Sequence, residues 1–312
     1  RKTFDIPFPP QKATVWISGD TKYRCWVNGH HVASGPAEVG GDFGNRESPD
    51  WWFYEGVELA DSLHRARSLI REAELTSLPE DPRWGGQGLP FLISMAALDY
   101  MLGANYALSG YVHMGHGTGK MIELYGTDLL KELFLENLYT AKWGGTMLLT
   151  EPEAGSDATS QSTTAIDCGD HYLLNGTKNW ITNGGRSDVY LVIAQTDRAK
   201  GHRGINAFIV EKGMEGFHIG PKEDKLGIRG SDTHTLQFNE VKVPKENRIG
   251  EDGFGFKFAM KTLAGGRIGI ASQALGIACG AYELALAYSK QRKAFGKEIM
   301  HHQAIQFKLA DM

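Results

Sequence analysis

The sequence predicts a multidomain protein of mixed α and β structure, in which two β segments alternate with two helical ones. Apolar residues recur at every second position in the first and third segments, as in half-buried strands. In the second and fourth segments they recur at every third or fourth position, as on one face of a helix. We therefore expect segments at residues 1–68, 69–145, 146–250 and 251–312.

The first segment is predicted to be all β. The stretch KATVWISGD alternates, KYRCWVNGHHVASG carries an Asn28-Gly29 pair typical of a hairpin turn, and DWWFYEGVEL is rich in aromatic residues. From about Leu69 the pattern becomes helical, with helix-like stretches at residues 91–102 and 129–138. The second segment is therefore mainly α.

The third segment is predicted to be a second sheet or barrel. Residues 171–182 are expected to fold back at Asn175-Gly176, and DVYLVIAQ is a short continuous apolar run. The stretches INAFIVEK and THTLQFNEVKVP both alternate. After Gly253 the helical period returns and persists to about Ser289. Gly296 interrupts it, and a new apolar stripe begins near the end of the chain.

Composition excludes several classes of function. A formal charge of −4 over 312 residues, without a basic cluster, argues against nucleic-acid binding. The three cysteines, Cys25, Cys168 and Cys279, form no CxxC pair and predict reduced thiols in a reducing compartment. No run reaches about 18 apolar residues and no signal peptide is visible, so we expect no membrane span. The chain lacks an initiating Met and stops mid-pattern at Met312, which predicts a fragment.

Three short motifs favour structural explanations. Residues 114–121, MGHGTGKM, lack the first glycine and the hydroxyl of a phosphate-binding loop. His113 and His116 share a helix face without a third ligand at the right spacing, so we expect satisfied or exposed histidines and no metal site. Asn175-Gly176-Thr177 matches a glycosylation sequon, but a hairpin turn explains it better. Motifs of the GxSxG, HExxH and GxGxxG types are absent.

Small polar and aromatic residues are grouped on two β segments, 147–156 and 180–182. Hydroxyls and backbone groups beside an aromatic ring suit a planar, polar cofactor, with Trp180 covering one face. A plain hairpin with a packed Trp180 has the same residue pattern. The pattern alone leaves both interpretations open.

Residues from about 74 to 312 resemble the acyl-CoA dehydrogenase family. The resemblance is carried by LLTEPEAGSDATS, YLLNGTKNWITNGG, KLGIRGSDTHTLQFNEVKVP, GGRIGIASQALGIACGAYELALAYSKQRKAFGK and HHQAIQFKLADM, in this order. It implies a helical domain, here truncated, a middle β-barrel domain and the start of a C-terminal helical bundle. It also implies FAD as the cofactor and oxidation of an acyl-CoA thioester to the trans-2-enoyl-CoA, with an electron-transfer flavoprotein as acceptor.

The resemblance assigns roles by matching position. The residues matching the first flavin-binding stretch are Met147, Leu149, Thr150, Gly155 and Ser156, and those matching the second are Trp180, Ile181 and Thr182. Ser156 and Arg267 match residues at the acyl-CoA. Arg292 and Gln303 match residues that reach FAD across a subunit contact, which implies a homodimer or homotetramer. The implied location is the bacterial cytoplasm or the mitochondrial matrix.

The chain departs from the family at three points. The catalytic glutamate of most members would lie beyond Met312, and the alternative position of the base is Gly266 here. Ala264 stands where many relatives carry an aspartate that meets the CoA arm. The first segment is β where the family has helices. We therefore expect no catalytic base within the chain and negligible turnover from residues 1–312 alone.

Residues 1–68 resemble the β-sandwich that precedes the catalytic domain of α-L-rhamnosidase-like glycoside hydrolases. YRCWVNGHHVASGP is the centre of this resemblance. An alternative function is therefore a carbohydrate-binding module, with Trp51 and Trp52 stacking on sugars, fused to an inactive flavoprotein-like remnant. Core packing is the commoner role for such aromatics. Asp42, Glu47, Asp50 and Glu55 are more simply a polar loop face than a glycosidase pair.

Overall fold

The computed structural model describes residues 2–4, 13–17, 23–27, 30–34, 68–73 and 75–312. The chain divides into two compact units, one made of Arg1–Ala66 with Tyr282–Met312 and the other of Arg67–Ala281. The two units are described separately below. The candidate site belongs to the second.

In the first unit, four short strands form an antiparallel sheet in the order β1-β2-β3-β4. The strands are β1 (Lys2–Phe4), β2 (Ala13–Ile17), β3 (Tyr23–Val27) and β4 (His30–Ser34). The Asn28-Gly29 pair lies between β3 and β4, outside the described residues, as do Trp51, Trp52 and the four acids near them. A sandwich needs two packed sheets, and only this sheet is found among the described residues of the segment.

In the described residues of the helical segment, a short helical stretch at 68–72 comes before two long helices, and both long helices extend further than the periodicity predicts. They are α2 (Phe91–Tyr125) and α3 (Asp128–Tyr139), preceded by the short η2 (Pro82–Trp84). α2 bends at Asn105 (φ −162°, ψ 99°), whose Oδ1 accepts a hydrogen bond from Leu108 N at 3.1 Å. The Asn105 side chain thus caps the second half of the helix. Glycines in this half weaken the apolar pattern, which is why the sequence underestimates the length of α2.

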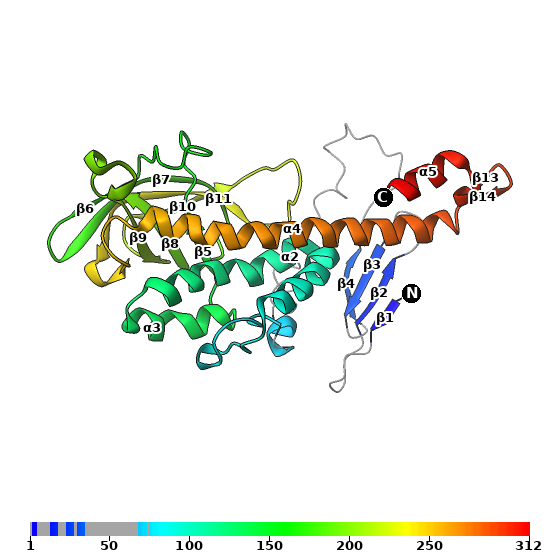
Figure 1. The fold of residues 1–312 in the computed structure, drawn as a ribbon, viewed down its shortest axis with the longest axis horizontal. Helices are drawn as coiled ribbons and strands as arrows, with labels where there is room; N and C mark the ends of the chain where they lie inside the picture. Colours follow the sequence, from blue (N-terminus) through cyan, green and yellow to red (C-terminus); the bar gives the residue numbers. More distant parts are fainter. Residues whose placement is uncertain (1, 5–12, 18–22, 28–29, 35–67, 74) are drawn as a thin grey trace. The chain divides into compact units, whose positions relative to one another are not determined.

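Helix α2 uses glycine for close packing on both sides of its bend. A Cβ on Gly119 would lie 2.6 Å from the Tyr139 ring of α3, and one on Gly103 would lie 2.7 Å from the Gly276 carbonyl of α4. Figure 1 shows α2 running beside α3 and beside the first part of α4. The glycines that hide the helix in the sequence therefore let its neighbours approach in space. The segment 114–121 lies inside α2, so it forms no phosphate-binding loop.

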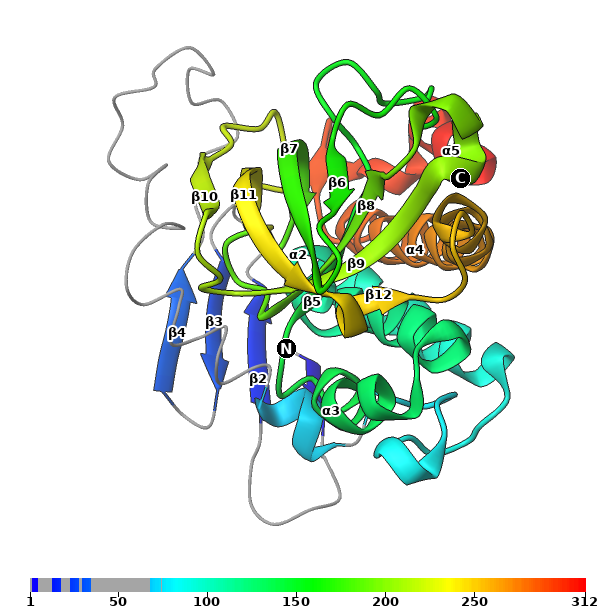
Figure 2. The same cartoon turned by 90° about the vertical axis from the view of Figure 1, so that its left-hand side faces the viewer.

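The third segment forms an eight-stranded mixed sheet in the order β10-β11-β7-β6-β8-β9-β12, with β5 paired in parallel to β8 (Figure 2). The strands are β5 (Gly145–Leu148), β6 (Thr164–Asp167), β7 (His171–Thr182), β8 (Val189–Gln195), β9 (Ile205–Glu211), β10 (Phe217–Lys222), β11 (Thr233–Pro244) and β12 (Arg248–Ile249). The apolar runs predicted as strands are strands. The two edge strands, β10 and β12, are not hydrogen-bonded to each other. The sheet therefore does not close into the expected barrel but stays open.

Both faces of the sheet are buried at β8. Val189, Leu191 and Ile193 join a core shared with α2, α3 and α4, whereas Tyr190 and Val192 join a core made of strand residues. A strand covered on both faces is continuously apolar, which explains the DVYLVIAQ run. The second core is buried by residues of the sheet and the β9–β10 connection, so the sheet curves over its own face.

The predicted hairpin at Asn175-Gly176 is wrong, because β7 is continuous from His171 to Thr182. Asn175 Oδ1 instead accepts a hydrogen bond at 2.9 Å from the backbone N of Glu240, at a register shift of β11. Gly176 has φ +147°, and a Cβ there would lie 2.4 Å from Thr163 Oγ1. The pair therefore accommodates a bulge and a close strand contact, for which the local sequence is the same as for a turn.

The last segment begins with α4 (Gly255–Ser289), as its periodicity predicts. The interruption at Gly296 is a two-residue hairpin between β13 (Lys293–Ala294) and β14 (Lys297–Glu298), followed by η5 (Ile299–His301) and α5 (Gln303–Asp311). By length and composition alone, α4 is apolar enough to cross a membrane, a test that core helices of soluble proteins also pass. Helix α4 is mostly exposed in the structure.

Candidate functional site

The two predicted flavin stretches meet in space at the end of β5. The ladder between β5 and β8 stops at Leu148, and the chain then crosses to β7. There the Thr150 carbonyl accepts a hydrogen bond from Asn179 N at 2.9 Å, and Thr146 Oγ1 donates to the Thr182 carbonyl at 2.9 Å. The structure thus brings residues 147–150 beside residues 179–182. The side chains of Met147 and Leu149 are partly buried and pack on the helix-side core.

The acid and proline after Thr150 form a tight turn. Glu151 and Ala154 pair with each other through two backbone hydrogen bonds of 3.1 and 3.2 Å. Gly155 and Ser156 follow the turn and are exposed, and a Cβ on Gly155 would meet nothing within 4 Å. The turn, which begins directly after Thr150, therefore presents an accessible backbone and a free Ser156 hydroxyl.

Trp180 lies in a β-bulge with an unfavourable backbone conformation. Asn179 and Trp180 of β7 both lie opposite Thr235 of β11, and Trp180 has φ +54°. An aromatic residue in the left-handed region is uncommon and costs free energy. The indole is 60% exposed, whereas the side chain of Ile181 is buried in the strand-side core. The bulge therefore turns a large aromatic ring out of the sheet, and Ile181 has only its backbone to offer a ligand.

The turn after Thr182 is held by an aspartate that the sequence did not single out. Asp232 accepts a hydrogen bond from Gly185 N at 2.8 Å through Oδ2, and its carbonyl accepts from Asn183 N at 2.6 Å. Asp232 Oδ1 also contacts His234 Nε2 at 2.8 Å. The motif SDTHTLQF thereby fixes the end of the motif WITNGG. No local pattern links them, because the two stretches are about 50 residues apart in sequence.

A buried ion pair lies beneath the site, and it too was missed. Lys178 Nζ and Glu151 Oε1 are 2.8 Å apart, with side chains 0% and 1% exposed. Burial opposes ionisation of Glu151, but the charge of Lys178 and several hydrogen bonds outweigh it and lower the pKa of Glu151 to about 2. Burial lowers the pKa of Lys178 to about 8 despite Glu151. Both groups are therefore charged near neutral pH. A lysine in an alternating stretch ordinarily faces water, so the sequence carried no signal for this pair.

The free groups at the site fit a planar, polar ring. The hydroxyls of Thr150, Ser156 and Thr182 have no hydrogen-bond partner among the described residues, while the carbonyls of Thr150 and Thr182 are paired. The unpaired hydroxyls of Thr150 and Thr182, near an exposed indole, offer hydrogen bonds to ring heteroatoms and a flat apolar cover. The donor set thus suits an isoalloxazine ring, which FAD carries.

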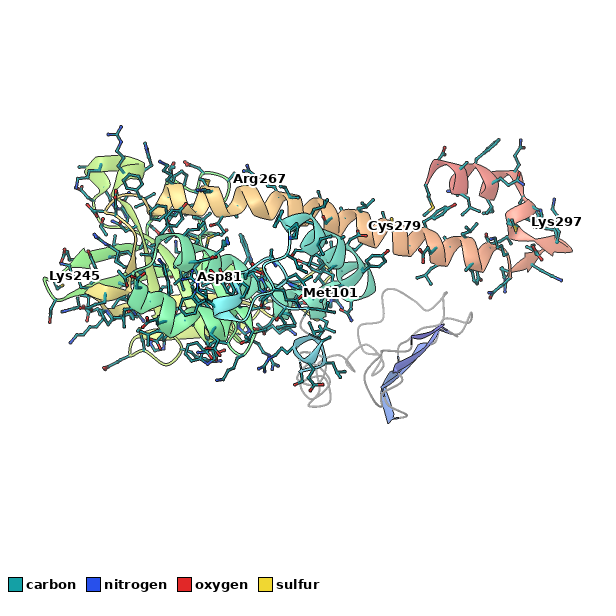
Figure 3. All side chains as sticks on the ribbon, turned by 60° about the horizontal axis from the view of Figure 1, so that its bottom comes forward. Asp81, Met101, Lys245, Arg267, Cys279 and Lys297 are labelled. Atoms are coloured by element: carbon teal, nitrogen blue, oxygen red, sulfur yellow. The ribbon has the colours of Figure 1, made fainter. Side chains whose placement is uncertain are left out.

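The remaining predicted residues lie outside this cluster. Arg267 lies on α4, where Figure 3 labels it. It is exposed and belongs to the same unit as the cluster. Arg292 is exposed next to β13, and Gln303 is exposed at the first position of α5. Both belong to the other unit, so their role toward the flavin stays a prediction.

The two histidines of α2, His113 and His116, are not exposed, and each has a ring nitrogen without a hydrogen-bond partner among the described residues. His116 Nδ1 lies 3.4 Å from Glu80 Oε1, and the Nε2 atoms of His113 and His116 have no partner among the described residues. Burial and then the neighbouring His116 lower the pKa of His113 to about 3, so its ring is neutral near neutral pH. No group of three metal-ligating side chains occurs in the described part of the chain. The expectation of satisfied or exposed histidines is corrected accordingly.

Comparison with known proteins covers most of the second unit. Residues 146–241 match the family model "Acyl-CoA dehydrogenase, middle domain", and residues 253–312 match "Acyl-CoA dehydrogenase, C-terminal domain". The short-chain-specific acyl-CoA dehydrogenase of Clostridium acetobutylicum is 45% identical over 243 residues, 76% of this chain. The mitochondrial short-chain-specific enzyme of Rattus norvegicus is 38% identical over an alignment of 312 residues, covering 88% of this chain and 76% of the rat protein.

Solved structures agree with these matches. Butyryl-CoA dehydrogenase from Megasphaera elsdenii has a TM-score of 0.72 and 45% identity, covering 80% of this chain and 68% of that one. More distant neighbours at 26% identity include PigA structures that contain FAD. The resemblance of residues 1–68 to rhamnosidases has no support from these comparisons. The chain spans 63% of the length of the Clostridium relative. The chain belongs to the acyl-CoA dehydrogenase family.

Proposed function

We propose that this chain binds FAD and serves the oxidation of an acyl-CoA thioester to the trans-2-enoyl-CoA. One observation carries the proposal: residues 147–150 and 179–182 meet in space and leave free hydroxyls beside an exposed, strained Trp180. A strained aromatic side chain turned outward is more economically explained by a ligand than by packing. Membership of the acyl-CoA dehydrogenase family supports FAD as that ligand.

The residues of the site have distinct tasks in this proposal. Thr150 donates a hydrogen bond to the polar edge of the isoalloxazine, and Trp180 covers one face of the ring and excludes water. Bound FAD would supply the acceptor for the hydride leaving the β carbon. Ser156 and Arg267 bind the thioester substrate, the arginine through an anionic group of the CoA moiety. The position one residue before Arg267 is Gly266, which has no side chain to act as a base.

The substrate class is proposed from the relatives' names, and the partners and the location from the family resemblance. Two curated relatives are short-chain-specific enzymes and one solved relative is a butyryl-CoA dehydrogenase, so we propose a short acyl chain. An electron-transfer flavoprotein is the proposed acceptor. Arg292 and Gln303 are proposed to reach the FAD of a second copy, in a homodimer or homotetramer. The proposed location is the bacterial cytoplasm or the mitochondrial matrix.

FAD uptake by the purified chain tests the proposal directly. Incubation with FAD followed by gel filtration is expected to yield a yellow protein with a visible flavin spectrum. Thr150→Val, which removes the hydroxyl and keeps the shape, is expected to alter this spectrum. The matched control is Thr177→Val, on the same strand as Trp180 but outside the site. A chain that stays colourless under these conditions would refute the FAD assignment.

The substrate assignment has a separate readout. Butyryl-CoA is expected to perturb the visible spectrum of the bound FAD, and Ser156→Ala and Arg267→Ala are expected to raise the concentration needed. Lys261→Ala, an exposed residue nearby on α4, is the control for Arg267. A spectrum unaffected by butyryl-CoA would refute the substrate class while leaving the cofactor assignment in place.

A further inference from the structure

The buried Lys178 makes three hydrogen bonds, enough to use every proton of its ammonium group. Nζ donates to Glu151 Oε1 at 2.8 Å, to Gln161 Oε1 at 3.0 Å and to the backbone carbonyl of Leu149 at 3.2 Å. A buried ion pair is often no more stabilising than apolar residues of the same volume. The reason for placing a charged pair here is therefore better sought in the geometry it imposes than in stability.

The geometry concerns the backbone directly before and at Thr150. Leu149 lies just past the β5–β8 ladder, so its carbonyl has no ladder partner, and the Lys178 ammonium takes that place. The next carbonyl, that of Thr150, accepts from Asn179 N. Two consecutive carbonyls of the first stretch are thus bound by two consecutive residues of β7. Trp180 follows at once in the bulge.

Glu151 fastens the other side of the same turn. Its Oε2 accepts from both N and Oγ of Ser162 at 2.6 Å, and Oε1 accepts from Thr163 N at 3.1 Å. The loop that carries Ser156 begins after Glu151, and its far end is bound to the Glu151 carboxylate. The Lys178–Glu151 pair joins this loop to β7 at a single buried point.

We infer that Lys178 is a positioning residue, which holds the Leu149 carbonyl so that the Thr150 hydroxyl and the Trp180 ring face the flavin together. The inference rests on the proposed function, because it concerns the same site. Because the Lys178 side chain is fully buried, the inference gives it no direct contact with the cofactor. Its effect passes through the backbone of residues 149 and 150 and through the bulge at 179–180.

The experiment removes the tether without leaving a buried charge. Lys178→Met alone would leave the Glu151 carboxylate buried without its counter-ion. The decisive variant is therefore Lys178→Met combined with Glu151→Leu, which replaces the ion pair by apolar side chains of similar size. Lys245→Met is the matched control, since Lys245 makes a lysine–carboxylate pair with Asp167 at the opposite end of the β7–β11 ladder (Figure 3). All variants are made in the full chain.

Two readouts separate positioning from simple stability. The double variant is expected to melt cooperatively and yet to bind FAD at least about tenfold more weakly, with an altered visible spectrum. A tenfold change is about the free energy of one charge-assisted hydrogen bond. Without FAD, the Asn179 amide, which donates to Thr150, is expected to exchange its hydrogen at least about tenfold faster, while the Val192 amide in β8 keeps its rate. The Lys245→Met variant is expected to match the wild type in every readout.

Each other outcome overturns the inference. A double variant that folds and binds FAD with the wild-type Kd and spectrum shows that the tether does not position the site, and leaves the proposed function intact. A double variant that fails to fold shows that the pair serves the fold itself. A wild-type chain that takes up no FAD overturns the proposed function and the inference with it.

Discussion

Replacing Trp180 by glycine and by alanine separates the strain at this position from the contacts of the indole. Both variants remove the ring, which is 60% exposed, so they lose the same packing. They differ in the Cβ atom, which is disfavoured at φ +54°. The comparison therefore measures the backbone strain of the bulge and little else.

The magnitude follows from two opposing terms. A Cβ in the left-handed region costs about 1–2 kcal/mol. Glycine costs about 0.5–1 kcal/mol through the entropy of the unfolded chain. Thr177, on the same strand with a negative φ, serves as the reference, where alanine is expected to be the more stable substitution. The difference between the two sites cancels the glycine term and leaves about 1–2 kcal/mol in favour of Trp180→Gly.

The four variants are Trp180→Gly, Trp180→Ala, Thr177→Gly and Thr177→Ala. Their unfolding in urea without FAD, followed by far-UV circular dichroism, measures this difference. With an m value of about 2 kcal/mol/M, the strain corresponds to about 0.5–1 M in the midpoint. Both Trp180 variants are also expected to bind FAD at least about tenfold more weakly, since the ring cover is gone. If alanine is the more stable substitution at both sites, by the same amount, the argument from strain is refuted.

Two further predictions concern packing and pH. Gly176→Ala is expected to lower the free energy of unfolding by about 1–3 kcal/mol, because the new Cβ would lie 2.4 Å from Thr163 Oγ1. Gly265→Ala is expected to raise it by about 0.5–1 kcal/mol, because its Cβ would meet no atom within 4 Å and alanine favours the helix. Urea midpoints that move in the same direction for both variants would contradict this. Burial and His116 lower the pKa of His113 from 6.5 to about 3, so the folded state binds fewer protons than the unfolded state between these values and stability is lost as pH falls from 6.5 to 3. His113→Leu is expected to flatten this part of the stability curve, measured by urea unfolding at several pH values, and an unchanged slope would exclude His113 as its cause.

Local patterns were sufficient for elements whose residues respond to their own neighbours in sequence. The apolar run from Val189 to Gln195 predicted a strand, and the structure has a strand there with both faces covered. The helical stripe after Gly253 predicted α4 to its last residue, Ser289. In each case the apolar period is set by the element itself, so no distant contact was needed.

Local patterns failed where a distant group determines the conformation. Asn175-Gly176 has the residues of a hairpin turn, but Glu240 and Thr163, from other strands, use the same residues for a bulge and a close contact. The glycine-rich half of α2 has a weak apolar pattern, yet it is helical and packs closely on α3. Propensity is a small free energy, and tertiary contacts of several kcal/mol override it.

The sequence by itself determined the order of the segments, the strands and long helices, and the two stretches that matter for function. It named Thr150, Ser156 and Trp180 through the motifs that carry them. Only the tertiary structure decided that these stretches touch, that Trp180 is turned outward by a strained bulge, and that Lys178 and Glu151 hold the loop from below. The contacts that join the two stretches are hydrogen bonds between residues 27 or more positions apart, whose partners no local period specifies.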